Sequence, residues 1–186
     1  CTILDIFSTP NDGYDKARFA VEETYRRTMD LPDDGTIYAG TIQGSIYPDL
    51  RRKSAMLMSG SGVKYLPIGG VVPMLESYSY SDLVTAIHSA KMKTDFSIPV
   101  HLFGGGHPMF LALSVLAGID MFDSASYIKY ARDDRILMQD RTLDLSDLEE
   151  MPSWSPIANR YTTAELRDLE REERTKALAT HNLFAI

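Results

Sequence analysis

The sequence is poor in cysteine and in long apolar runs. Cys1 is its single cysteine in 186 residues, so neither an internal disulfide nor a cysteine-based metal site can form within the chain. No stretch approaches the roughly 20 consecutive apolar residues that a membrane-spanning helix needs. The first residues also lack the basic start of a secretory signal. These absences favour a cytoplasmic domain with no membrane segment.

Positive charge is also scarce. The chain has 19 Lys and Arg against 26 Asp and Glu, which gives a net charge of -7, and its pI is about 5.0. A free-standing nucleic-acid binder draws much of its affinity from neutralising phosphates, so this balance argues against that class, although a local basic patch remains compatible with it. The apolar fraction of 44% is ordinary for a globular core, and the length fits one domain or a large piece of one.

Short apolar runs alternate with helical patterns five times along the chain. Each unit is roughly 30 residues long, which is typical of βα units and a parallel sheet. The expected strands are 2–7, 36–42, 63–68, 99–103 and 119–122. The expected helices are 14–30, 49–59, 81–92 and 109–116, the last apolar on nearly every face and therefore expected to be mostly covered.

Each expected strand carries small or polar residues at its carboxyl end. They are Asp5, Gln43-Gly44-Ser45, Gly69-Gly70, Gly104-Gly105-Gly106 and Asp123. Five such ends on one rim are what a (β/α)₈ barrel presents to its substrate. Five units do not close an eight-stranded barrel, so either an open doubly wound sheet or a barrel without its opening strands is predicted. The chain starts on strand-like residues without a methionine, which suggests that upstream sequence is missing.

Asp123 is the first catalytic candidate because it ends a strand and precedes small residues. A helix cap is an equally good interpretation from position alone. The segment after it is expected to be a polar loop that extends to Arg135. Further on, Thr162 or Thr163 is expected to cap a last helical region, with Glu165 in its first turn. The charged stretch 165–176 is expected to be a solvated helical face.

Several motifs, in this order and spacing, resemble the archaeal tRNA-guanine transglycosylase family. They are Thr41-Ile42-Gln43-Gly44-Ser45, Tyr47-Pro48-Asp49-Leu50-Arg51, Pro67-Ile68-Gly69-Gly70-Val71-Val72-Pro73, His101-Leu102-Phe103-Gly104, His107-Pro108, Phe122-Asp123-Ser124-Ala125-Ser126-Tyr127 and Tyr130-Ala131-Arg132-Asp133-Asp134-Arg135. The family fold is a (β/α)₈ barrel, so the resemblance implies an α/β chain that forms part of such a barrel with a helical C-terminal tail. Residues 1–145 would be its later βα units, and residues 146–186 a degenerate zinc-type subdomain.

The resemblance implies base exchange at a guanosine in the tRNA D-loop, with guanine replaced by a 7-deazaguanine such as preQ0 during archaeosine biosynthesis. Asp123 matches the nucleophile, which attacks the ribose anomeric carbon and forms a covalent intermediate. The matches to base-binding positions are Asp5, Gln43, Gly69 and Gly70. For these the alternatives are an acid that caps a turn, for Asp5, and a tight turn, for the glycines.

Other polar residues receive weaker assignments. His101 and His107 are expected to satisfy buried polar groups near the rim. Arg132 and Arg135 either contact tRNA phosphate or lie in a solvated loop. The family's zinc ligands are three cysteines and a histidine, whereas the matching positions here are Ser153, Ser155, Ala158 and His181. One histidine cannot hold zinc, so no metal is expected, and no cofactor is implied.

The resemblance also has gaps. An upstream family segment with a further aspartate and an aromatic residue is absent, as are the C-terminal RNA-binding domains, so this pentosyltransferase chain is expected to be weak or inactive alone. A transglycosylase-like domain of archaeosine synthase is one alternative, which the lost cysteines favour. A non-catalytic tRNA-binding or scaffold subunit is another. The expected partners are tRNA, a guanine or 7-deazaguanine base, and a missing barrel half or a second copy.

Overall fold

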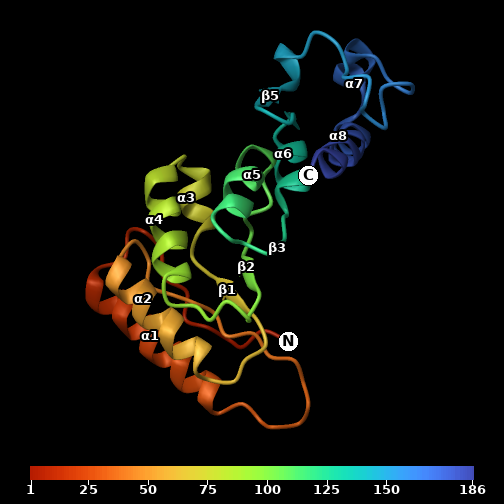
Figure 1. Ribbon diagram of the computed structural model, residues 1–186. Coiled ribbons are helices and arrows are strands. Elements are labelled where there is room, and N and C mark those ends of the chain that lie inside the picture. The colour runs from red at the N-terminus through yellow and green to blue at the C-terminus, as the bar shows by residue number, and fades with distance from the viewer. The chain divides into compact units, whose positions relative to one another are not determined.

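The structure, a computed structural model, describes all 186 residues (Figure 1). Its helices are α1 (Tyr14–Met29), α2 (Pro48–Ser59), α3 (Val72–Glu76), α4 (Tyr80–Lys91), α5 (Pro108–Leu116), α6 (Ser126–Arg132), α7 (Thr163–Asp168) and α8 (Arg171–Ala185). Its strands are β1 (Leu66–Ile68), β2 (Val100–Leu102), β3 (Met121–Phe122), β4 (Arg135–Leu137) and β5 (Thr142–Asp144), and a 3₁₀ turn spans Leu145–Asp147.

The chain divides into two compact units. The first comprises Cys1–Gly105 and Leu113–Asp123, and the second comprises Gly106–Ala112 and Ser124–Ile186. The first unit holds all the predicted strand-end residues except Gly106, and the second holds the tail. The assignment of residues 146–186 as a degenerate zinc-type subdomain stays a prediction.

The first unit is built on parallel strand segments, as the alternating pattern predicts. β1 pairs with β2 and β2 pairs with β3, both parallel. Two earlier segments extend the order through parallel bridges, from Thr2 to Ala39 and from Ala39 to Tyr65. The predicted strands 2–7 and 36–42 are therefore too long, because only single bridges form there. The α/β class with a parallel sheet is confirmed.

The register aligns the carboxyl ends of four segments in one row. Ile42 pairs with Ile68, Ile68 pairs with Leu102, and Leu102 pairs with Phe122. The next residue along each segment is then Gln43, Gly69, Phe103 or Asp123. Because successive side chains of a strand point to opposite faces, these four residues lie on the face opposite the apolar row. Parallel pairing thus brings residues from distant parts of the sequence to one edge.

Helices α1, α2 and α4 follow the predicted ranges 14–30, 49–59 and 81–92 within one or two residues. Their apolar residues recur at helical spacing, and the buried faces include Val21, Leu50, Met58 and Ile87. α1 contacts α2 and α2 contacts α4, so the three helices form one layer (Figure 1). Within this layer, α2 also contacts strand β1.

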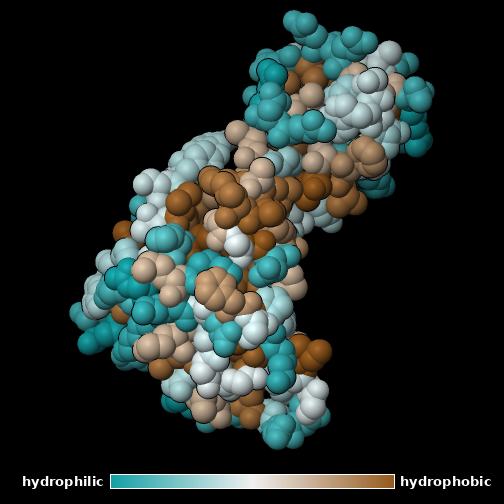
Figure 2. Space-filling view, viewed as in Figure 1, coloured by the Kyte–Doolittle hydropathy of each residue, from teal (hydrophilic) through white to brown (hydrophobic).

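Helix α5 departs from the expectation that it is mostly covered. Phe110 and Ser114 are buried, but Met109, Leu113 and Val115 are exposed, and Leu116 is 84% exposed. Its apolar residues form part of the hydrophobic surface seen in Figure 2. A helix that is apolar all round requires cover on every side, and these 186 residues provide it on one side only.

The second unit has its own core, made by Ala131, Ile136, Leu145, Leu148, Met151, Ile157, Leu166, Ala177 and Leu178. The predicted polar loop after Asp123 is wrong, because Ser126–Arg132 forms helix α6, which packs on α8. An antiparallel hairpin of β4 and β5 was not predicted either. The predicted cap is confirmed, since Thr162 and Glu165 form a reciprocal capping box at the start of α7.

Candidate active site

The carboxylate of Asp123 is held through one of its two oxygens. Asp123 directly follows β3, and its Oδ1 accepts hydrogen bonds from the Gly104 N–H at 2.8 Å and from His101 Nε2 at 2.9 Å. An ionised carboxylate only accepts, so Nε2 of His101 carries the proton in this contact. The side chain of Asp123 is 56% exposed, whereas that of His101 is 15% exposed. The arrangement fixes the carboxylate through Oδ1, and neither of these hydrogen bonds uses Oδ2.

The interpretation of Asp123 as a helix cap is wrong. Helix α6 begins at Ser126 with Ala125 at its N-cap, and the Ser126 N–H donates to the Ser124 hydroxyl instead. The interpretation of His101 also changes, because this histidine does not satisfy an unrelated buried group. It contacts the one residue that the sequence predicts to be the nucleophile.

Asp5 and Gln43 are brought together, as their predicted shared role requires. Gln43 is fully buried, and its Nε2 donates to Asp5 Oδ2 while its Oε1 accepts from the Ser8 hydroxyl at 3.3 Å. The backbone N–H of Gln43 donates to the Ser54 hydroxyl of α2 at 3.0 Å. Asp5 is therefore oriented by a neighbouring side chain, and the alternative of a turn-capping acid is replaced. That turn is capped by Asp12, whose Oδ2 accepts from the Thr9 N–H.

The Gly69-Gly70 pair fits closely against this network. A Cβ at Gly69 would lie 2.7 Å from Gln43 Nε2, and a Cβ at Gly70 would lie 2.5 Å from the Ser8 carbonyl oxygen. Gly70 also has φ +71, a backbone conformation that residues with a side chain rarely adopt. The two glycines therefore make a tight turn that approaches Gln43 and Ser8 closely. Contact of this turn with a base stays a prediction.

A buried guanidinium supports the same loops from beneath. Arg51 of α2 is fully buried and donates to three backbone carbonyls, those of Ile42, Ser45 and Gly69, at 3.1, 2.8 and 2.8 Å. Burial lowers the pKa of Arg51 to about 10, so the group still carries its charge at neutral pH. Sequence reasoning missed it, because an arginine in an amphipathic helix normally faces solvent.

Phe103 is a second residue that sequence reasoning did not single out. It lies in the same row as Gly69 and Asp123, and its ring packs edge-on against His101 with centroids 4.7 Å apart. In the sequence, the feature that could have identified Phe103 is its position directly between a strand and three glycines. Such a ring offers a flat apolar surface at the edge where the predicted site residues gather.

The arginines predicted to contact phosphate lie in the second unit. Arg132 is exposed at the end of α6. Arg135 stacks on the Tyr130 ring and lies 3.6 Å from Asp144, so its charge is already partly engaged. His107, also in this unit, has its Nε2 3.4 Å from the Thr142 hydroxyl, and burial lowers its pKa. Phosphate contact by Arg132 and Arg135 stays a prediction.

His181 uses both ring nitrogens within the protein. Nε2 donates to the Leu137 carbonyl, and Nδ1 accepts from the Ser155 hydroxyl, each at 2.8 Å. Burial lowers its pKa, which matches this neutral form. No group of three or more His, Cys, Asp or Glu residues is placed to hold a metal ion. A hydrogen-bonded pair thus stands where the resemblance would place two zinc ligands, and a zinc-free tail stays a prediction.

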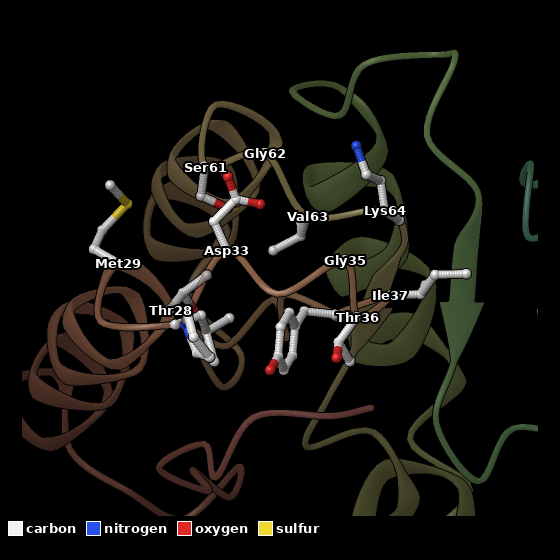
Figure 3. A pocket seen from close by; sticks show the side chains of 13 residues that line it. Thr28, Met29, Asp33, Gly35, Thr36, Ile37, Ser61, Gly62, Val63 and Lys64 are labelled. Carbon is white, nitrogen blue, oxygen red and sulfur yellow. The ribbon is translucent and has the colours of Figure 1, made fainter.

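A separate cavity of about 360 Å³ lies in the first unit (Figure 3). Its walls come from the segment after α1 and the turn after α2, including Asp33, Ile37, Ser61 and Lys64. These residues precede the bridges at Ala39 and Tyr65, so the cavity is at the amino ends of the segments. It is at the opposite edge from Asp123.

None of the helices is long and apolar enough to cross a membrane.

Comparison with known proteins gives the family of the chain. The family described as queuine tRNA-ribosyltransferase matches residues 1–186. Proteins named tRNA-guanine(15) transglycosylase are 58% identical in Picrophilus torridus, 55% in Thermoplasma acidophilum and 46% in Thermococcus onnurineus, each over the whole of this chain. The chain spans only 29% of the first two relatives and 32% of the third. The chain belongs to the queuine tRNA-ribosyltransferase family.

Proposed function

We propose that the protein exchanges a guanine base in tRNA for another base, with Asp123 as the nucleophile. The observation that carries the proposal is the carboxylate held by His101 and Gly104 at the carboxyl end of a parallel strand. Strand carboxyl ends are where α/β folds place their chemistry. The names of the relatives include tRNA-guanine(15) transglycosylation, which supports the same reaction for this chain.

The reaction consists of two displacements at one carbon. Oδ2 of Asp123 attacks C1′ of the ribose, the C1′–N9 bond breaks, and its electron pair leaves with the guanine. The departing guanine gains a proton at N9 from water, and the incoming base gives up the proton of its attacking nitrogen to water. That nitrogen then bonds to C1′ as the C1′–Oδ2 bond breaks, which restores the carboxylate of Asp123. A covalent intermediate avoids a free oxocarbenium ion, as in retaining glycosidases. A carboxylate fixed through Oδ1 suits this role, because attack then needs little reorganisation.

Base recognition in this proposal uses Asp5, Gln43, the Gly69-Gly70 turn and Phe103. Asp5, oriented by Gln43, can accept N–H groups from the edge of a guanine through its carboxylate. The Gly69-Gly70 turn admits a flat ring close to the backbone. Phe103 supplies a face on which that ring can stack. We propose a 7-deazaguanine such as preQ0 as the incoming base and position 15 in the D-loop as the target.

The finer fold belongs to the same proposal. We propose that the five parallel segments are the later part of a (β/α)₈ barrel. The supporting observations are the parallel register, the shared polar edge and the family to which the chain belongs. The exposed apolar residues of α5 are consistent with cover from further protein.

The test is incorporation of labelled guanine into unmodified tRNA by the protein as encoded, with any sequence that flanks these 186 residues. We expect incorporation with the parent and none with D123N at equal folded concentration. Retained tRNA binding without incorporation in the parent would favour a non-catalytic or archaeosine-synthase-like role instead. Incorporation that survives in D123N would overturn the assignment of the nucleophile.

A further inference from the structure

Arg51 holds together two loops that come from different parts of the sequence. Its Nε donates to the Ser45 carbonyl, and its Nη1 donates to the carbonyls of both Ile42 and Gly69. The carbonyls of Ile42 and Ser45 lie on either side of Gln43 in the sequence, and the carbonyl of Gly69 belongs to the glycine turn. One planar side chain therefore sets the position of the Gln43 loop relative to Gly69-Gly70.

The charge of Arg51 has no carboxylate partner. The guanidinium takes part in no ion pair, and all its hydrogen-bond acceptors are backbone carbonyls. Its Nη2 has no hydrogen-bond partner and lies 3.7 Å from the position a Gly70 Cβ would take. Burying an unneutralised charge is costly, so the residue is poorly explained by stability alone.

We infer that Arg51 is a positioning residue for base exchange, which fixes the spacing between Gln43 and the Gly69-Gly70 turn and thereby sets the affinity for the exchanged base. The inference rests on the proposed function. A pocket for a flat base has to keep its spacing while one base leaves and another enters, because loose loops would lose affinity for both. Arg51 can provide that rigidity since a planar fork loses little freedom on forming several hydrogen bonds.

A positive charge beneath the loops also matches the chemistry of the departing base. As the C1′–N9 bond breaks, the electron pair moves onto the base, and the incoming base likewise reacts after losing a proton. A buried cation near the Gly70 turn favours both negatively charged forms electrostatically. Lysine would keep this charge but would lose the planar set of donors, so the two contributions can be separated by substitution.

The experiment compares R51K with R167K in the protein as encoded. Arg167 is a matched control, because it also donates to three backbone carbonyls, those of Leu145, Ser146 and Leu148, but in the second unit. KM for the free base and kcat are measured with saturating tRNA, and the active fraction is counted by the covalent tRNA adduct. The thermal midpoint of each variant is recorded, and R51Q is a second variant that keeps a planar donor group.

We expect R51K to raise KM for the base about tenfold or more while kcat per active site changes less than threefold, and a tenfold rise corresponds to about 1.4 kcal/mol. R167K is expected to lower the thermal midpoint without changing KM. Unchanged KM in R51K, an equal rise in R167K, or failure of both Arg51 variants to fold would overturn the inference. If the parent itself exchanges no base, the proposed function fails rather than the role of Arg51.

Discussion

Substitution of Gly70 by alanine tests the close approach of the glycine turn to the Ser8 backbone. The new Cβ would lie 2.5 Å from the Ser8 carbonyl oxygen, and backbone cannot move aside as a flexible side chain can. The residue also has φ +71, where a side chain costs roughly 1–2 kcal/mol. Forcing an atom into filled space adds typically about 1–3 kcal/mol. Alanine recovers about 0.4–1 kcal/mol by restricting the unfolded chain.

The balance predicts that G70A lowers the free energy of unfolding by about 2–4 kcal/mol. Gly35 is the matched control, because its φ is +79 and no atom lies within 4 Å of its added Cβ. G35A should therefore cost only about 1 kcal/mol, from backbone conformation alone. Urea denaturation of both variants and the parent gives the two values. KM for the base should rise in G70A and stay constant in G35A.

Equal losses of stability in G70A and G35A would refute this reasoning, because the contact with Ser8 would then contribute nothing. An unchanged KM in G70A would separately refute the placement of the turn in the base site. The comparison is informative because both variants make the same chemical change at a similar positive φ. Only the surroundings of the new methyl group differ.

Three further predictions concern single contacts. H101F removes the hydrogen bond to Asp123 Oδ1, and hydrogen bonds to charged groups contribute about 1.5–3 kcal/mol. In the exchange assay, kcat should therefore fall at least tenfold with little change in KM. An unchanged kcat would contradict the role of His101. Because the pKa of His181 is lowered in the folded protein, its contribution to stability is complete above the ordinary pKa of 6.5 and is lost as the pH falls below that value. The unfolding midpoint should therefore drop between pH 7 and 5 in the parent and change less with pH in H181Q. An equally steep drop in H181Q would assign the pH dependence to another group. T162A removes the capping box of α7 and should lower the free energy of unfolding by about 1 kcal/mol. T180A, at an exposed position of α8, should cost less, and equal losses would count against the capping box.

Helices α1, α2, α4 and α5 and the alternation of strands with helices could be predicted from sequence, because apolar spacing and glycine breaks are local signals. α1 and α2 match their predicted ranges for that reason. The strands 2–7 and 36–42 were predicted too long, since apolar character does not reveal how much of a segment finds a hydrogen-bonding neighbour. Helix α6 was missed because Ala131 is its single buried residue, so it lacks an apolar stripe.

The candidate site could be predicted only in part. Asp123, Gln43 and the glycines stand at strand ends, where their type and position carry information. The contact between His101 and Asp123 spans 22 residues and depends on the parallel register of β2 and β3, which no local pattern fixes. The burial of Arg51 depends on how α2 packs beneath the loops. A charged residue at a helical position gives no sign of that in the sequence.

The central claim is that Asp123 forms a covalent bond to the ribose of tRNA. The most direct measurement mixes the protein as encoded with tRNA, denatures the mixture, and maps the modified peptide by mass spectrometry. The account predicts a ribose-linked adduct on Asp123 in the parent, no adduct in D123N, and the usual adduct in D120N, a neighbouring acid whose carboxylate accepts from the Val100 N–H instead. An adduct on another residue, or one that persists in D123N, would contradict the account.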